Sequence, residues 1–153
     1  RARLDVCALA RRVVEETQPA VDGRALVLRC AEDALMISGD ELRIEQALQN
    51  LIQNALKYSP PTHPVVVEVA RRDNRVHVAV HDDGIGIPQD SLPHLFERFY
   101  RARNIDGRQV SGMGIGLYVV KEIVTLHGGT VGVESVEGAG STFTITLPLE
   151  QET

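Results

Sequence analysis

The sequence predicts a single α/β domain, with helices packed on a largely antiparallel sheet. Two observations lead to this class. Segments whose apolar residues recur with helical spacing alternate along the chain with segments in which valines recur at every second position. The chain has 153 residues, of which 43% are hydrophobic, and this suits one compact domain with its own core.

Charge and composition narrow the class of protein. The net charge is −5, from 16 basic and 21 acidic residues, so a basic face for nucleic acid is not expected. No apolar run has membrane-spanning length, and the sequence begins with Arg1 rather than Met. We therefore expect a soluble fragment of a longer protein. Cys7 and Cys30 lack the spacing of a metal site and are expected to be reduced residues of the core.

The first part of the chain predicts a helix and two short strands. Residues 25–30 and 35–38 are short apolar runs, which are typical of strands. Before them, residues 1–22 are expected to form a lead-in helix. The residues expected to share one face of this helix are Leu4, Cys7, Ala8, Arg11 and Val14.

A long amphipathic helix is predicted next, followed by a hairpin. The helix runs over residues 40–58, because Asp40 can cap the free amides of its first turn and Pro60 cannot continue its hydrogen bonds. Apolar residues then alternate in 65–71 and 75–82, which is typical of two strands joined by a turn.

The second half of the chain is expected to contain two loops, a helix and a final strand pair. In order, these are a Gly-rich loop at 82–87, a short amphipathic segment at 90–100, a polar loop at 101–111, an apolar helix at 112–126, and strands at 130–135 and 142–147.

Asn50, Asn54 and Lys57 form one polar stripe on the long helix, because they are spaced by four and three residues. Two amides and an ammonium group at the rim of the core could bind a hydrated metal ion and a phosphate chain. A solvated helix face would carry the same residues. Asn is a poor helix former, however, so two of them in one register favour a functional reason.

Asp82, Gly84 and Gly86 belong to the loop with the sequence DDGIGI. A carboxylate at a strand end can accept a hydrogen bond from an exocyclic amine, and glycines let the backbone approach a flat ligand closely. Adenine presents such an amine where guanine presents a carbonyl, so Asp82 would select adenine. For this segment alone, a plain acidic turn is the alternative.

Gly112, Gly114 and Gly116 stand at the start of the apolar helix. The exposed amides and the helix dipole make such a start a site for anions. It is not a P-loop, because no Lys followed by Ser or Thr comes after the glycines. Its spacing also differs from the dinucleotide-binding fingerprint.

Five segments carry recognisable motifs in a fixed order: 50–58, 82–87, 95–101, 112–117 and 138–143. They resemble the N box, first glycine box, F box, second glycine box and last glycine motif of the catalytic domains of sensor histidine kinases. These domains belong to an ATPase superfamily shared with gyrase B and MutL, and the resemblance covers nearly the whole chain. It implies the Bergerat fold, an α+β two-layer sandwich in which three helices cover one face of a mixed, largely antiparallel sheet.

The resemblance also implies the site. ATP and Mg²⁺ would be bound, and residues 96–112 would form a lid over ATP. The implied catalytic residues are Asn50, Asn54, Lys57 and Arg101, with Asn54 as the metal ligand and Asn50 as a second candidate ligand. The implied nucleotide-binding residues are Asn54, Lys57, Tyr58, Asp82, Gly84, Gly86, Ile87, Gly112, Gly114, Gly116, Leu117 and Thr142.

By the same resemblance, the γ-phosphate would pass to a histidine on a separate helical domain of the same protein, and a response regulator would act downstream. Asn50 stands where gyrase-like relatives carry a water-activating glutamate, which favours a kinase over fast hydrolysis. We expect a monomeric cytoplasmic domain, in a parent protein that can be anchored in the inner membrane. The histidines of this chain do not show the acceptor pattern of the family, so the isolated chain is not expected to phosphorylate itself.

Two alternative functions stay open at this point. One is a non-catalytic domain that senses nucleotide through the order of its lid. The other is a serine kinase of the anti-sigma type from the same superfamily.

Overall fold

The computed structural model describes residues 1–18, 25–30, 34–98 and 113–150, with only the backbone described at 113–115. The elements in chain order are β1 (Ala2–Asp5), α1 (Val6–Thr17), β2 (Leu26–Cys30), β3 (Met36–Gly39), α2 (Glu41–Tyr58), β4 (Val65–Arg72), β5 (Arg75–Asp82), α3 (Met113–Leu126), β6 (Thr130–Val136) and β7 (Gly140–Pro148).

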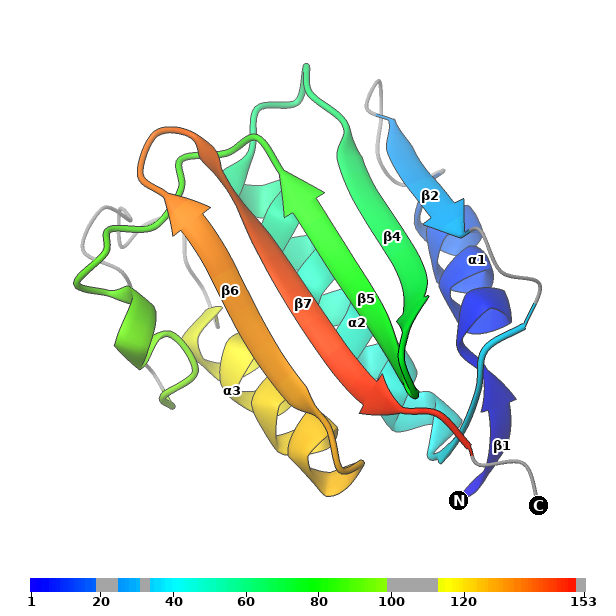
Figure 1. Cartoon of the computed structure of the whole chain (residues 1–153). Helices are drawn as coiled ribbons and strands as arrows, with labels where there is room; N and C mark the ends of the chain where they lie inside the picture. Colours follow the sequence, from blue (N-terminus) through cyan, green and yellow to red (C-terminus); the bar gives the residue numbers. More distant parts are fainter. Residues whose placement is uncertain (19–24, 31–33, 99–112, 151–153) are drawn as a thin grey trace.

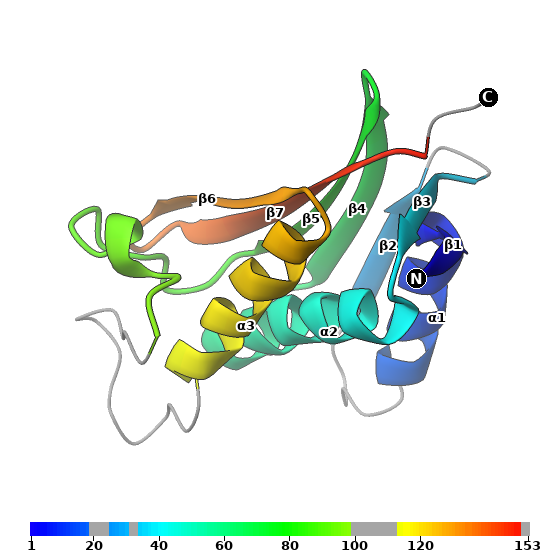
Figure 2. The same ribbon diagram turned by 90° about the horizontal axis from the view of Figure 1, so that it is seen from below.

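Five strands form the main sheet in the order β2-β4-β5-β7-β6, and β1 and β3 form a separate small sheet. Strands β2 and β4 are parallel, while the other neighbours in the main sheet are antiparallel. The three helices lie on one face of the main sheet (Figure 1), and no described helix covers the other face (Figure 2). The expected α+β sandwich with a mixed, largely antiparallel sheet is confirmed.

Helix α2 packs between α1 and α3 and carries one side of the candidate site. Its start is fixed by Asp40, whose carboxylate accepts a hydrogen bond from the Arg43 amide at 3.3 Å. At its end the Ser59 hydroxyl donates to the carbonyl of Ala55 at 2.6 Å. The prediction of a helix over 40–58 is confirmed. Its buried face consists of Ile44, Ala47, Leu48, Leu51, Ile52 and Ala55.

The N-terminal segment departs from the prediction of one helix over residues 1–22. Strand β1 comes first and pairs antiparallel with β3, and α1 begins only at Val6. Asp5 marks the change, because its carboxylate accepts hydrogen bonds from the amides of Cys7 and Leu35. A contact with a segment some thirty residues away therefore overrides the helical spacing of the first residues.

The face that the spacing predicted for this helix is also not the buried one. Ala8 and Arg11, which spacing from Leu4 placed on it, are exposed. Leu4 lies in β1, so the count began outside the helix. The buried residues of α1 are Val6, Cys7, Leu9, Ala10, Val13 and Val14.

Cys7 and Cys30 are joined by a disulfide, so the expectation of two reduced cysteines is wrong. Cys7 is fully buried in the first turn of α1, and Cys30 ends β2 at the edge of the main sheet. The two residues meet because α1 packs against β2. Their separation of 23 positions gives no sign of this contact.

The remaining elements follow the predictions, with two refinements. The strands predicted at 25–30 and 35–38 exist as β2 and β3 but lie in different sheets. The described part of the segment predicted at 90–100 forms one 3₁₀ turn, Leu92–His94. The hairpin β4–β5 and the pair β6–β7 form as expected. Within the described residues, no helix combines the length and apolar character that crossing a lipid bilayer requires.

Candidate functional site

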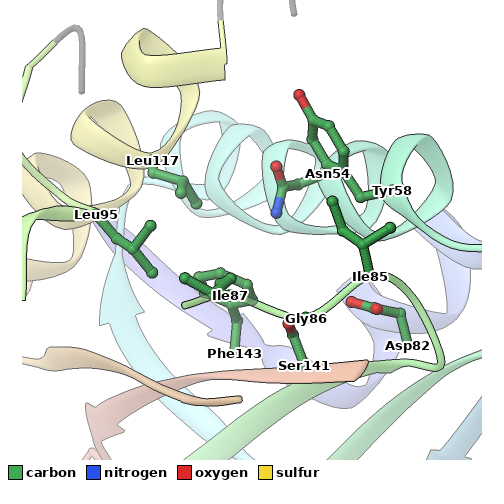
Figure 3. Close-up of a pocket in the computed structure, with 10 residues that line it drawn as sticks. All are labelled: Asn54, Tyr58, Asp82, Ile85, Gly86, Ile87, Leu95, Leu117, Ser141 and Phe143. Atoms are coloured by element: carbon green, nitrogen blue, oxygen red, sulfur yellow. The ribbon is translucent and has the colours of Figure 1, made fainter. Parts of the chain in front are cut away.

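A pocket opens between the helical layer and one end of the main sheet (Figure 3). Its empty volume, with the open mouth included, is about 380 Å³. Most of its walls are apolar, with a few polar groups among them. The lining residues are Asn54, Tyr58, Asp82, Ile85, Gly86, Ile87, Leu95, Leu117, Ser141 and Phe143.

Asp82 is the acidic residue of the pocket and stands at the end of β5. Its backbone pairs with Ser141 of β7, so both side chains point to the same face of the sheet, toward the helices. The Gly84 amide donates to Oδ1 of Asp82 at 2.8 Å and fixes the orientation of the carboxylate. A carboxylate held in this way can accept hydrogen bonds from a ligand that carries donors.

Gly84 and Gly86 are required by close backbone contacts within the protein. A Cβ on Gly84 would lie 2.2 Å from the carbonyl oxygen of Tyr58, and one on Gly86 would lie 2.0 Å from that of Val136. Gly86 also has a φ of 68°, a region that favours glycine. The loop is therefore held between the end of α2 and the end of β6, which fixes its position at the pocket.

Two serine hydroxyls support the floor of the pocket. Ser135 donates to the Gly140 carbonyl at 2.9 Å and accepts from the Ile87 amide at 2.8 Å. Because a hydroxyl has only one hydrogen, Ser141 must be the donor in its 2.8 Å contact with Ser135. The Ser141 oxygen is then an acceptor at the pocket wall, beside Asp82.

Helix α2 brings Asn54 and Tyr58 to the pocket, and Figure 3 shows both side chains along its upper edge. Asn50 lies one turn earlier, where its Nδ2 donates to the carbonyl of Gly116 at 3.3 Å and so joins α2 to α3. Lys57 is exposed and does not line the pocket. Of the polar stripe expected on this helix, the structure therefore brings only Asn54 to the pocket wall.

Helix α3 contributes Leu117, which is 4% exposed and lines the pocket. A Cβ on Gly116 would meet no described atom within 4 Å, so packing against the described residues does not explain this glycine. Gly114 lies in the first turn of α3, and only its backbone is described. Gly112 and Arg101 lie outside the described residues.

Thr142 is not brought to the pocket. Its Oγ1 lies 2.8 Å from Nδ1 of His81, on the sheet face that the helices leave uncovered. Ser141 and Phe143, its neighbours in β7, point the other way and line the pocket. The alternation of Phe143 and Ile145 with threonines marks the inward face of β7, so the sequence held a signal that would have placed Thr142 outside.

Ile85 and Leu95 are two further lining residues that motif matching missed. They belong to the first glycine box and the F box, but the resemblance assigned no role to their side chains. The neighbour of Leu95, Phe96, packs edge-on against Phe143, with ring centroids 6.2 Å apart and planes at 85°. The F box therefore builds part of the apolar wall.

Comparison with known proteins places this chain in one family. Residues 39–151 match the family described as histidine kinase-, DNA gyrase B-, and HSP90-like ATPase, and the chain belongs to this family. It is similar to two sensor histidine kinases, YkoH of Bacillus subtilis (strain 168), 40% identical over 136 residues, and CusS of Escherichia coli (strain K12), 40% identical over 137 residues. These matches cover 89% and 90% of this chain but only 30% and 28% of those proteins.

Solved structures agree with this assignment. The mycobacterial sensor histidine kinase MprB superposes with a TM-score of 0.86 at 26% identity, over 98% of this chain and 99% of that one. Full-length ShkA in complex with AMPPNP superposes with a TM-score of 0.84 at 28% identity, over 99% of this chain and 32% of that one. The resemblance to histidine kinase catalytic domains is thereby confirmed.

Proposed function

We propose that the chain is the ATP-binding catalytic domain of a sensor histidine kinase, which transfers the γ-phosphoryl group of ATP to a histidine on a separate helical domain of the same protein. The observation that carries the proposal is the pocket: one fixed carboxylate at the sheet, apolar walls, and the start of α3 at the other side, in a chain of this ATPase family. The names of YkoH and CusS, and the AMPPNP complex of ShkA, support it.

The base of ATP would bind at the sheet side of the pocket. Asp82 would accept a hydrogen bond from the adenine amine, and the apolar side chains of Ile85, Ile87 and Phe143 would contact the ring. Guanine has a carbonyl where adenine has the amine, so it would set an oxygen against the carboxylate. Two acceptors at this wall, Asp82 and Ser141, suit a ligand edge that donates.

The phosphates would bind at the start of α3. Gly116 supports this, because glycine in a helix costs about 1 kcal/mol relative to alanine and the described packing gives no reason for it. A phosphate chain needs close backbone approach and is attracted to the positive end of the helix dipole. We assign Gly112, Gly114, Gly116 and Leu117 to this end. Lys57 and Arg101 would supply cations, the former from the exposed face of α2.

Mg²⁺ would be held mainly together with the phosphates. Among the residues that the structure describes, no group of three or more His, Cys, Asp and Glu side chains could hold a metal ion. Magnesium commonly takes only one or two protein groups and completes its shell with phosphate oxygens and water, so the Asn54 amide suits it. The oxygen of Asn50 is a second candidate, since its Nδ2 already binds the Gly116 carbonyl. Bound magnesium would neutralise charge on the phosphates.

The proposal also includes parts that lie outside this chain. They are a helical phosphoacceptor domain and a downstream response regulator, with this chain as a monomeric cytoplasmic module of a protein anchored in the inner membrane. The chain spans less than a third of YkoH and CusS, which leaves room for such parts. The assignment of residues 96–112 as the lid also belongs to the proposal, because 99–112 lie outside the described residues.

Calorimetric titration with ATP and GTP in the presence of Mg²⁺ tests the pocket. We expect ATP to bind at least about tenfold more tightly than GTP, which is the order of one charged hydrogen bond. Equal affinities, or no uptake of either nucleotide by protein that circular dichroism shows to be folded, would contradict the proposal.

A further inference from the structure

His127 follows α3 and is buried, with 7% of its surface exposed. Its Nδ1 lies 2.8 Å from the carbonyl oxygen of Ile123, and its Nε2 accepts a hydrogen bond from the backbone amide of Asp40 at 3.0 Å. Asp40 is the residue that caps the start of α2. The imidazole therefore links the end of one helix of the pocket to the start of the other.

The two hydrogen bonds define the form of the ring. The Asp40 amide is a donor, so Nε2 carries no hydrogen. The Ile123 carbonyl is an acceptor, so the single hydrogen is on Nδ1. The linking group is a neutral imidazole of defined tautomer, with both nitrogens used.

Gly39 shows that this contact is closely fitted. A Cβ on Gly39 would lie 2.8 Å from Cδ2 and 3.0 Å from Nε2 of His127, too close for any side chain. Gly39 does not have a positive φ, so backbone conformation does not require glycine there. Residue 39 has no room for a side chain, because the imidazole of His127 occupies that space.

A second polar contact joins the same two helices near the pocket. Asn50 of α2 donates to the carbonyl of Gly116 in α3. The two helices run in opposite directions, so this contact and the one at His127 lie about ten residues apart on each helix, or about 15 Å. Two such contacts fix how far α3 can slide along α2, and with it the distance from Asn54 to the start of α3.

We propose that His127 is a positioning residue for the triphosphate. By holding the end of α3 on the start of α2, it sets the position of the phosphate-binding end of α3 relative to Asn54. The base is bound at Asp82, on β5, and does not depend on this contact. Loss of the link between His127 and Asp40 therefore weakens binding of ATP more than binding of AMP. The inference rests on the proposed function.

Two substitutions separate the two hydrogen bonds of the ring. The carboxamide of His127→Gln reaches the place of Nε2 and can accept from the Asp40 amide. That of His127→Asn reaches only the place of Nδ1 and keeps the bond to Ile123. We expect the Gln variant to bind ATP like the wild type and the Asn variant to bind it about three- to tenfold more weakly, as for one lost hydrogen bond. Both should keep the affinity for AMP.

Affinities are measured by competition against a fluorescent adenine nucleotide with Mg²⁺, at a temperature where thermal melts show all variants folded. Gly39→Ala, which displaces the ring from the other side, should lower the ATP affinity relative to AMP as well, and combining it with His127→Asn should add little. An Asn variant with an unchanged ratio of ATP to AMP affinity, or a Gln variant no better than Asn, would overturn the inference. A wild-type chain that binds neither nucleotide would instead overturn the proposed function.

Discussion

At the scale of single residues, β7 places two adjacent hydroxyl groups on opposite faces of the sheet. Ser141 faces the helices and lines the pocket, whereas Thr142 faces away and contacts His81 at 2.8 Å. The last glycine motif was assigned to the nucleotide through Thr142. Because Ser141 lines the pocket and Thr142 does not, we propose Ser141 for that role instead.

This transfer gives a matched pair of variants. Thr142→Val removes a hydroxyl from the uncovered face of the sheet, so we expect ATP affinity within about twofold of the wild type. Ser141→Ala removes an acceptor from the pocket wall and its bond to Ser135, and we expect a loss of about three- to tenfold, as for one hydrogen bond. Calorimetry with ATP and Mg²⁺ measures both. A larger loss for the valine variant than for the alanine variant would return the role to Thr142.

Asp82→Asn tests the residue proposed to select the base. The amide keeps the shape of the side chain but can present a donor to the adenine amine, and the charge is lost. We expect ATP affinity to fall by about ten- to a hundredfold, because hydrogen bonds to charged groups contribute roughly 1.5–3 kcal/mol. Asp83→Asn is the control, since the Asp83 side chain is 64% exposed and lies against His63 instead of the pocket. Equal losses in both variants would point to a general charge effect.

At the scale of elements, the sequence predicts those parts that bury their own apolar face. Helix α2 has such a face from Ile44 to Ala55, and β4 buries Val65, Val67 and Val69 in strict alternation. Strand β1 has four residues, too few to establish a period, and pairing with β3 decides its structure. The disulfide between Cys7 and Cys30 is also a tertiary contact, and local sequence patterns cannot predict it.

This disulfide ties α1 to the edge strand β2, and the two elements lie side by side in Figure 1. Neither element contributes a lining residue to the pocket. We expect reduction of the disulfide to lower the free energy of unfolding by about 3 kcal/mol, because a bridge over a loop of this length restricts the unfolded chain by roughly that amount. ATP affinity should not change. Denaturant unfolding with and without a reductant measures the effect.

A variant with Cys7→Ser and Cys30→Ser serves as the control for this measurement. Its unfolding midpoint should not respond to the reductant. If the wild-type chain has the same unfolding midpoint under oxidising and reducing conditions, the disulfide does not form in solution.

At the scale of the whole molecule, the pocket is assembled from segments that are far apart in sequence. The motif order predicts Asn54, Tyr58, Asp82, Gly86, Ile87 and Leu117, and the structure places all of them at the pocket. It cannot predict the rest of the apolar wall, because Leu95 and Phe143 become lining residues only when the F box packs on β7. Nor could it show that the Asn50 amide is engaged by α3, which depends on how two helices cross.

The same arrangement keeps every histidine of the chain out of the pocket, since none of the five is among its lining residues. Each has another place in the fold. His63 lies near Asp83, His77 near Thr146, His81 near Thr142, His94 near Glu97, and His127 holds Asp40. A histidine acceptor is therefore missing from the described lining of the pocket.

We accordingly expect the isolated chain to bind ATP without labelling itself. Phosphoryl transfer requires the nucleophile to be held close to, and in line with, the γ-phosphate, and only a second domain can bring an imidazole to the mouth of the pocket. Incubation with γ-³²P-ATP and Mg²⁺ should leave the chain unlabelled, while adding the helical domain of the parent protein should give label on that domain. The label should be lost in acid, because phosphohistidine is acid-labile whereas phosphoserine is not. Stable label on the isolated chain would contradict the proposal that the acceptor histidine lies on a separate domain. Acid-stable label on the helical domain would favour a serine kinase.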